Sequence, residues 1–204
     1  MIVVLTCICL LSGSLMFSYW LGLFAKVNLR GIGDGNPGAF NLWKGAGFKF
    51  GLLGVALDFL KGYLPVFLIS HAGLVSNDQL IPIALAPIVG HAFSPFLSFK
   101  GGKSLAVTFG VWSALTAFRA SISLAVILAL MFLVVRVLNK GKVATSTEDG
   151  IQTTVGFLLL SLYLLIAKSP TAFLWIWLGN FLILLWKSRD AAAALFKSKT
   201  TPVR

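Results

Sequence analysis

Seven long apolar stretches constrain this chain more than any other feature of its sequence. They cover residues 2–24, 50–70, 80–99, 105–118, 120–138, 155–167 and 171–186. A helix of about 20 residues crosses the hydrocarbon core of a bilayer, where only helices and closed barrels satisfy their backbone groups. No stretch of about ten residues alternates in polarity as a barrel strand does. We therefore expect an all-α, polytopic membrane helix bundle with about seven transmembrane helices.

The composition excludes the soluble enzyme classes. Apolar residues make up 58% of the chain and charged residues 11%, whereas soluble domains average about 45–50% and about 25%. The first stretch has no preceding positive charge and is too long for a cleaved signal peptide, so we expect it to remain as a span. No internal repeat interrupts the chain, and we expect one membrane domain over residues 1–204. Only Arg119 divides the fourth and fifth stretches, so one long or re-entrant element there is an alternative.

The basic residues predict the orientation in the membrane. Lys and Arg together number 17, against 6 Asp and Glu. With the N-terminus outside, fourteen of these basic residues fall on the inner side and only Arg119 and Lys168 on the outer side. This bias predicts an N-out, C-in topology. The basic tail, about residues 187–204, is expected to lie on the inner membrane surface. Such a face attracts anionic lipids and anionic substrates.

The first inner connection combines glycines with amide and guanidinium groups. It reads R-G-I-G-D-G-N-P-G-A-F-N from Arg30 to Asn41. Gly33 and Gly35 allow positive φ and a close approach to a ligand, while Arg30 offers a planar fork for phosphate or carboxylate. Asn36 adds amide donors. The alternative is an ordinary flexible turn between two spans.

The second inner connection is a short lysine and glycine loop. Lys100, Gly101, Gly102, Lys103 and Ser104 stand between two predicted spans. Backbone N–H groups at a helix start point toward an anion and the helix dipole favours it, so this loop predicts a phosphate site. It lacks the spacing of a Walker A loop, so nucleotide hydrolysis does not follow. A plain positive-inside loop is the alternative.

Asp58, Lys61 and His91 lie inside predicted spans, where charge is costly. Asp58 and Lys61 are three residues apart on one helix face, so we expect an internal ion pair of structural or catalytic use. His91 is either a hydrogen-bonded core residue or a base. Cys7 and Cys9 read as apolar filler. No cluster of His, Cys and carboxylates indicates a metal site.

These pieces resemble, in order and spacing, the bacterial membrane acyl-phosphate:glycerol-3-phosphate acyltransferases, the PlsY family. The family pattern R-x-x-G-S-G-N-x-G-A-T-N corresponds to Arg30 through Asn41. D-F-x-K-G corresponds to the stretch from Asp58 to Gly62, and G-H-x-x-x-P to Gly90, His91 and Pro95. F-K-G-G-K corresponds to Phe99 through Lys103. The resemblance is dense over residues 13–110, and the family has seven helices with an outside N-terminus.

The resemblance implies transfer of a fatty acyl group from acyl phosphate to the sn-1 hydroxyl of glycerol 3-phosphate, which gives lysophosphatidic acid. It implies no metal or cofactor, no nucleic-acid partner, and a bacterial cytoplasmic membrane with the site facing the cytoplasm. Glycerol phosphate is expected on Lys100 to Lys103, and the acyl-phosphate headgroup near Arg30, Asn36 and Asn41. The expected catalytic residues are Asp34, Asn36, His91 and Lys103. The expected binding residues are Arg30, Gly33, Gly35, Asn41, Asp58, Lys61, Lys100, Gly101, Gly102, Ser104 and Arg189.

Three departures from the family pattern leave other functions open. Asp34 replaces a serine, so it must pair with Arg30 or serve as a base for the acceptor hydroxyl. Phe40 replaces a threonine. The family's C-terminal H-R-x-N becomes Lys187-Ser188-Arg189-Asp190, which keeps only the arginine. A non-catalytic homologue that binds acyl phosphate or lipid, or a small anion transporter, are the alternatives. Acyl-chain preference and oligomeric state stay open.

Overall fold

The computed structural model describes residues 1–140 and 146–200, with side chains for residues 1–140 and 150–189. All regular structure in these ranges is helical, as expected. The helices are α1 (Ile2–Ser14), α2 (Phe17–Phe24), α3 (Ala39–Ala46), α4 (Phe48–His71), α5 (Leu80–Ala92), α6 (Leu105–Thr116), α7 (Arg119–Leu138), α8 (Ser146–Ile166) and α9 (Thr171–Thr200), with short 3₁₀ turns η1 (Leu29–Gly31) and η2 (Pro95–Leu97).

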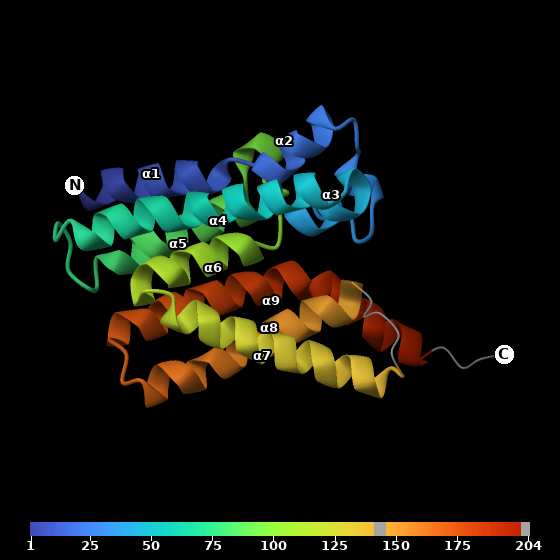
Figure 1. Ribbon diagram of the computed structural model, residues 1–204. Coiled ribbons are helices and arrows are strands. Elements are labelled where there is room, and N and C mark those ends of the chain that lie inside the picture. Colours follow the sequence, from blue (N-terminus) through green and yellow to red (C-terminus); the bar gives the residue numbers. More distant parts are fainter. Residues whose placement is uncertain (141–145, 201–204) are drawn as a thin grey trace.

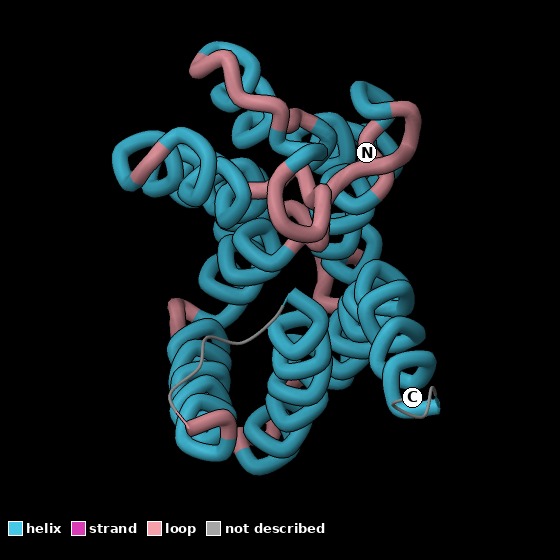
Figure 2. The backbone as a smooth tube through the Cα atoms, turned by 90° about the vertical axis from the view of Figure 1, so that its right-hand side faces the viewer, coloured by secondary structure: helices cyan, strands magenta, loops and turns pink. Residues whose placement is uncertain are grey.

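The helices form two groups that run roughly along one direction (Figure 1). The first group contains α1 packed on α5 and α4 packed on α6, and the second contains α7, α8 and α9. Contacts of α5 with α9 and of α6 with α7 join the two groups. Figure 2 views the molecule from the end where the C-terminus lies, so many helices appear end-on. The two groups therefore share one bundle.

Five segments are long and apolar enough to cross a membrane. Among the described residues they are Ile2–Phe24, Phe48–His71, Leu80–Leu97, Arg119–Leu138 and Thr171–Arg189. Leu105–Thr116 and Gly150–Ile166 are apolar helices of shorter length. All seven predicted stretches are thus helical. The alternative of one long element across Arg119 is wrong, because Ala117 and Phe118 have left-handed φ values of +46° and +67° and separate α6 from α7.

The helices differ in detail from three predicted segments, although Ile2–Phe24 is one apolar segment of membrane length, as predicted. The first stretch is two helices, because Leu15 and Met16 leave the helical conformation. The third stretch ends its helix at Ala92, shortly before Pro95, which cannot continue a helix without losing a hydrogen bond. The expected first inner loop contains α3, which begins at Ala39 directly after the Pro37-Gly38 pair.

Glycines bring the helices of the first group into backbone contact. A Cβ atom on Gly62 of α4 would lie 2.7 Å from the Val107 carbonyl oxygen, and one on Gly110 of α6 would lie 2.2 Å from that of Phe59. Small residues of this kind dominate helix contacts inside membranes, because lipid supplies no hydrophobic drive for association. In contrast, α7 presents most of its large apolar side chains to the outside. This outer face is suited to lipid.

Candidate active site

A cavity of about 750 Å³ lies between the two helix groups. Its polar lining comes mostly from the first inner connection, from α4 and α5, and from the lysine loop, with smaller contributions from α8 and α9. Its apolar lining comes largely from α6, α7 and α9. The polar members include Asp34, Asn36, Asn41, Asp58, His91, Lys103 and Ser104, and the apolar members include Val55, Phe109, Leu128, Ala129, Phe132 and Leu184. The cavity therefore suits a molecule with a polar head and an apolar chain.

An ion pair between Asp34 and Lys103 forms part of the polar lining. Lys103 Nζ lies 2.7 Å from Asp34 Oδ2, and the two side chains are 27% and 23% exposed. The other carboxylate oxygen of Asp34 accepts hydrogen bonds from the Asn36 backbone N–H at 3.2 Å and from Asn41 Nδ2 at 2.9 Å. The alternative that Asp34 pairs with Arg30 is wrong, because Lys103 reaches the carboxylate from the second connection.

The surroundings of Asp34 make it a weak base. Burial raises the pKa of its carboxyl, but the hydrogen bond and charge of Lys103, with the hydrogen bonds from Asn41 and Asn36, outweigh burial and lower the pKa to about 2. A group of such low pKa accepts a proton poorly near neutral pH. The geometry therefore favours a role for Asp34 in orienting Lys103.

Hydrogen bonds join the lysine loop to the first connection and to α9. Arg30 Nη2 donates to the Lys100 carbonyl oxygen at 2.8 Å. Lys187 Nζ donates to the carbonyl oxygens of Gly101 at 2.8 Å and Ala92 at 3.1 Å. Two segments distant in the sequence thus hold one loop, which fixes the position of Lys103 beside the cavity.

The two glycines of the lysine loop lie against the end of α5. The Gly102 N–H donates to the His91 carbonyl oxygen at 3.1 Å. A Cβ atom on Gly101 would fall 1.9 Å from that same oxygen, and one on Gly102 would fall 2.4 Å from His91 Nε2 and 3.2 Å from Asn36 Oδ1. A Cβ at Gly101 would overlap backbone, so only glycine fits there, whereas a Cβ at Gly102 would displace the His91 ring. Gly102 therefore marks the point where the His91 ring, the Asn36 amide and the loop meet.

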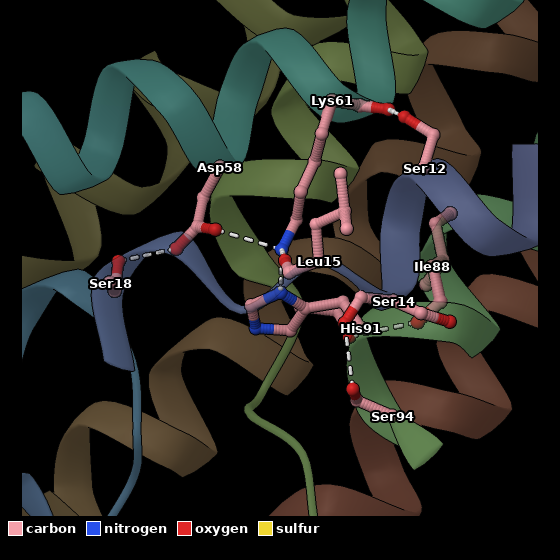
Figure 3. Close-up of polar contacts among 10 residues, drawn as sticks. Ser12, Ser14, Leu15, Ser18, Asp58, Lys61, Ile88, His91 and Ser94 are labelled. Carbon is pink, nitrogen blue, oxygen red and sulfur yellow. Dashed lines mark hydrogen bonds and ion pairs between the residues drawn. The ribbon is translucent and has the colours of Figure 1, made fainter. Parts of the chain in front are cut away.

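The predicted ion pair inside the bundle is present and extends to His91 (Figure 3). Lys61 Nζ lies 2.8 Å from Asp58 Oδ1 and 2.8 Å from His91 Nδ1. It also donates to the carbonyl oxygen of Leu15. Ser18 Oγ donates to Asp58 Oδ2 at 2.5 Å. All four side chains in this row are at most 5% exposed.

The structure brings seven of the predicted site residues to the cavity and leaves the others around it. All four predicted catalytic residues line it, together with Asn41, Asp58 and Ser104. Arg30, Gly33, Gly35, Lys61, Lys100, Gly101, Gly102 and Arg189 are not among the lining residues. The Ser104 hydroxyl has a structural role, because it donates a hydrogen bond to the Ile88 carbonyl oxygen at 3.0 Å. The Arg189 guanidinium stacks on Trp186 at 4.0 Å.

Sequence reasoning missed two parts of the site. Leu128, Phe132, Gln152, Thr153 and Ser188 line the cavity from the second helix group. The first two look like any residue of an apolar span, and the three polar ones lie just outside the predicted spans with no motif role assigned to them. Ser18 was also missed, since a single serine in an apolar helix is common. Only the three-dimensional contact with Asp58 reveals it.

The comparisons with known proteins cover nearly the whole chain. The family model described as glycerol-3-phosphate acyltransferase matches residues 3–198. Glycerol-3-phosphate acyltransferase 1 of Thermotoga maritima is 38% identical over 183 residues, which cover 88% of this chain and 90% of that protein.

Two crystal structures of PlsY, an integral membrane glycerol 3-phosphate acyltransferase, share the fold. The glycerol 3-phosphate form superposes with a TM-score of 0.83 over 100% of this chain and 96% of that one, and the lysophosphatidic acid form with 0.82 over 97% and 92%. Each is 24% identical to this chain, so this likeness concerns the fold. This fold, with the five long apolar segments, makes the chain an integral, multi-pass helical membrane protein. By sequence it belongs to the glycerol-3-phosphate acyltransferase family.

Proposed function

We propose that this protein transfers a fatty acyl group from acyl phosphate to the sn-1 hydroxyl of glycerol 3-phosphate and releases lysophosphatidic acid and phosphate. The observation that carries this proposal is the mixed lining of the cavity. Lys103 and two asparagines lie among its polar residues, and phenylalanines and leucines of α6, α7 and α9 supply apolar surface. Both substrates carry phosphate and one carries a long acyl chain, so each part of this lining has a matching chemical group.

The acceptor phosphate fits best beside Lys103 and the start of α6. Ser104, Leu105 and Ala106 all line the cavity, so the first turn of α6 borders it. The first N–H groups of a helix lack partners within the helix, and the dipole there favours an anion. The acyl-phosphate headgroup fits next to Asn36, with Arg30 nearby in the same connection. Asn41 Nδ2 already donates to Asp34 Oδ1 and to the carbonyl oxygens of Ile32 and Asn36, so Asn41 shapes this connection. The acyl chain would then follow Phe109, Leu128 and Phe132.

Catalysis in this scheme needs positioning and charge stabilisation more than a protein nucleophile. An acyl phosphate is already an activated mixed anhydride. The acceptor hydroxyl oxygen bonds to the carbonyl carbon, the bond to phosphate breaks, and the hydroxyl proton leaves with the departing phosphate. Negative charge develops on the carbonyl and phosphate oxygens during this step. Donors fixed in advance stabilise this charge at no cost in reorganisation. Lys103, Asn36 and His91 are the donors that we assign, with Asp34 holding Lys103 in place.

The arrangement of the helix ends supports a single seven-span domain with N-out, C-in topology. The N-terminus and the connections α4–α5, α6–α7 and α8–α9 lie at one end of the bundle, and α3 and the C-terminal end lie at the other (Figure 1). Lys26, Arg30, Lys44, Lys100 and Lys103 belong to the end that carries α3. Lys142 and Arg204 lie outside the described residues. We infer that this basic end, which carries the site, faces the cytoplasm of a bacterial cell.

The test is formation of lysophosphatidic acid by the purified protein from glycerol 3-phosphate and palmitoyl phosphate. Product is expected with palmitoyl phosphate and not with palmitoyl-CoA. Lys103→Ala is expected to lower kcat/KM by about 100-fold, the usual effect of removing one preorganised donor. Lys49→Ala, at an exposed position near the start of α4, is the matched control and should retain activity.

Failure of this assay would favour one of the two alternatives. A well-folded protein that forms no product from either donor contradicts the proposed reaction. Binding of palmitoyl phosphate without turnover would then indicate a non-catalytic homologue, and uptake of glycerol 3-phosphate into protein-loaded liposomes would indicate a transporter.

A further inference from the structure

We propose that Lys61 is a positioning residue that fixes the tautomer of His91, so that His91 Nε2 carries a proton and donates it in a hydrogen bond to an anionic substrate oxygen. Asp58 and Ser18 hold Lys61 in place for this task. The inference rests on the proposed function for the identity of the substrate, but the tautomer itself follows from contacts within the chain. It also removes Asp58 and Lys61 from the residues expected to bind substrate.

The contacts of Lys61 decide which nitrogen of His91 is protonated. A lysine ammonium has three N–H donors and no acceptor. Its Nζ has three partners, which are the Asp58 carboxylate, the Leu15 carbonyl oxygen and His91 Nδ1. Asp58 pairs with the ammonium by charge, and Leu15 accepts one of its protons. Because an ammonium can only donate, its 2.8 Å contact with His91 requires that Nδ1 accepts. Since Nδ1 accepts, it is unprotonated, and the neutral ring carries its proton on Nε2.

The free face of the ring lies toward the cavity. His91 lines the cavity although the residue is only 4% exposed. Within the described part of the chain, Nε2 has no hydrogen-bond partner, whereas Nδ1 is held (Figure 3). A Cβ atom on Gly102 would come within 2.4 Å of Nε2, so the glycine keeps this edge of the ring open. The Nε2–H at this edge is thus available to donate a hydrogen bond to a substrate oxygen in the cavity.

The rest of the row explains why Lys61 remains a cation in an apolar bundle. An ammonium at such a depth is costly unless it is paired. The carboxylate of Asp58 supplies the opposite charge, and Ser18 orients it from α2. The interruption between α1 and α2 frees the carbonyl oxygen of Leu15, which Lys61 occupies. The broken first span is therefore part of the device that orients His91.

The first test observes the tautomer directly by ¹⁵N NMR of histidine-labelled protein in detergent. The chain has two histidines, so a His71→Gln background leaves His91 as the only signal. We expect a single neutral form with the proton on Nε2. In Lys61→Met the Nδ1 resonance should shift, because its donor is gone, and Lys49→Met should leave it unchanged. A proton on Nδ1 in the parent protein, or an unmoved Nδ1 resonance in Lys61→Met, would overturn the proposal. This readout needs no catalytic activity.

The second test asks whether the orientation matters for the reaction. Lys61→Met is expected to lower kcat by about 10- to 100-fold, the effect of misplacing a reacting group by about 1 Å, and Lys61→Arg should recover part of the loss because it keeps the charge and donors. Ser18→Ala should give a smaller loss of kcat. It disturbs the same row of contacts more mildly, so it still tests the proposal if the Lys61 variants do not fold. His91→Gln should have a higher kcat than His91→Asn. The glutamine amide nitrogen can replace Nε2, whereas the asparagine amide reaches only the Nδ1 position.

The kinetic constants also locate the oxygen that accepts the hydrogen bond. A His91→Asn effect confined to KM for glycerol 3-phosphate indicates a contact with the acceptor phosphate, and an effect on kcat indicates a contact made in the transition state. Equal activity of His91→Gln and His91→Asn, with both proteins folded, would contradict donation from Nε2. If no variant or parent shows activity while the NMR result holds, the proposed reaction fails and the tautomer assignment stands.

Discussion

At the scale of single residues, Asp34 carries a negative charge where the resembled motif has serine, and Lys103 compensates it at 2.7 Å. The folded pKa of about 2 lies below the value of about 3.9 for an unfolded aspartate. The ion pair therefore stabilises the folded protein above pH ~4, and this contribution is lost as the pH falls toward 2. We expect the parent to unfold at a higher temperature than Asp34→Asn. This difference should be constant between about pH 7 and pH 5 and should shrink below pH ~4.

The same pKa predicts the pH dependence of the activity. Because Asp34 stays ionised throughout the working range, it should contribute no inflection to kcat between about pH 5 and pH 8. The measurement is the pH–rate profile of the parent and of Asp34→Asn. An acid limb near neutral pH that disappears in the variant would show that Asp34 acts as the base after all.

Gly102 offers a test of the close approach between the lysine loop and His91. A methyl group there would overlap His91 Nε2 at 2.4 Å, and the ring cannot turn away without losing Lys61. We expect Gly102→Ala to lower kcat/KM by about 10-fold or more while the protein still folds. Gly31→Ala is the matched control, because a Cβ there meets nothing nearer than 3.9 Å, and it should stay near the parent activity. Equal kinetics for the two variants would argue against the contact.

At the scale of the helices, the interruption of the first span depends on partners from elsewhere in the fold. Ser94 Oγ donates to the Ser14 carbonyl oxygen at 2.7 Å, and both residues are buried. Ser94→Ala would leave this carbonyl without its side-chain donor, which costs about 1–3 kcal/mol for a buried group. We expect a lower unfolding temperature than for Ser123→Ala, whose hydroxyl bonds only within α7 at an exposed position. Similar losses for both variants would mean that the break is stable without Ser94.

The helical elements were predictable from sequence because apolar runs have the length that a bilayer requires, and the boundary errors have local causes. The break at Leu15 has only a weak sequence signal: Ser12, Gly13 and Ser14 precede it without a proline. The stabilising cation, Lys61, comes from α4. The ion pair of Asp58 and Lys61 follows from their spacing alone. Its extension to His91 and Ser18 does not, because it depends on how α2, α4 and α5 pack. The first inner connection and the lysine loop predicted most of the polar lining of the cavity. The apolar lining from α7 and α9 had no sequence signal.

At the scale of the whole molecule, the proposed topology places the cavity's polar loops in the cytoplasm and the α4–α5 connection outside. Asn77 in that connection and Lys49 near the start of α4 are both exposed and lie at opposite ends of α4. In a background with Cys7 and Cys9 replaced by alanine, Asn77→Cys should react with a membrane-impermeant maleimide added to intact cells. Lys49→Cys should react only after the cells are permeabilised, since the positive-inside bias holds that end within. The reverse labelling pattern would invert the topology and separate the basic loops from cytoplasmic glycerol 3-phosphate. Retained acyltransferase activity in each labelled variant would show that the reporter cysteines leave the fold intact.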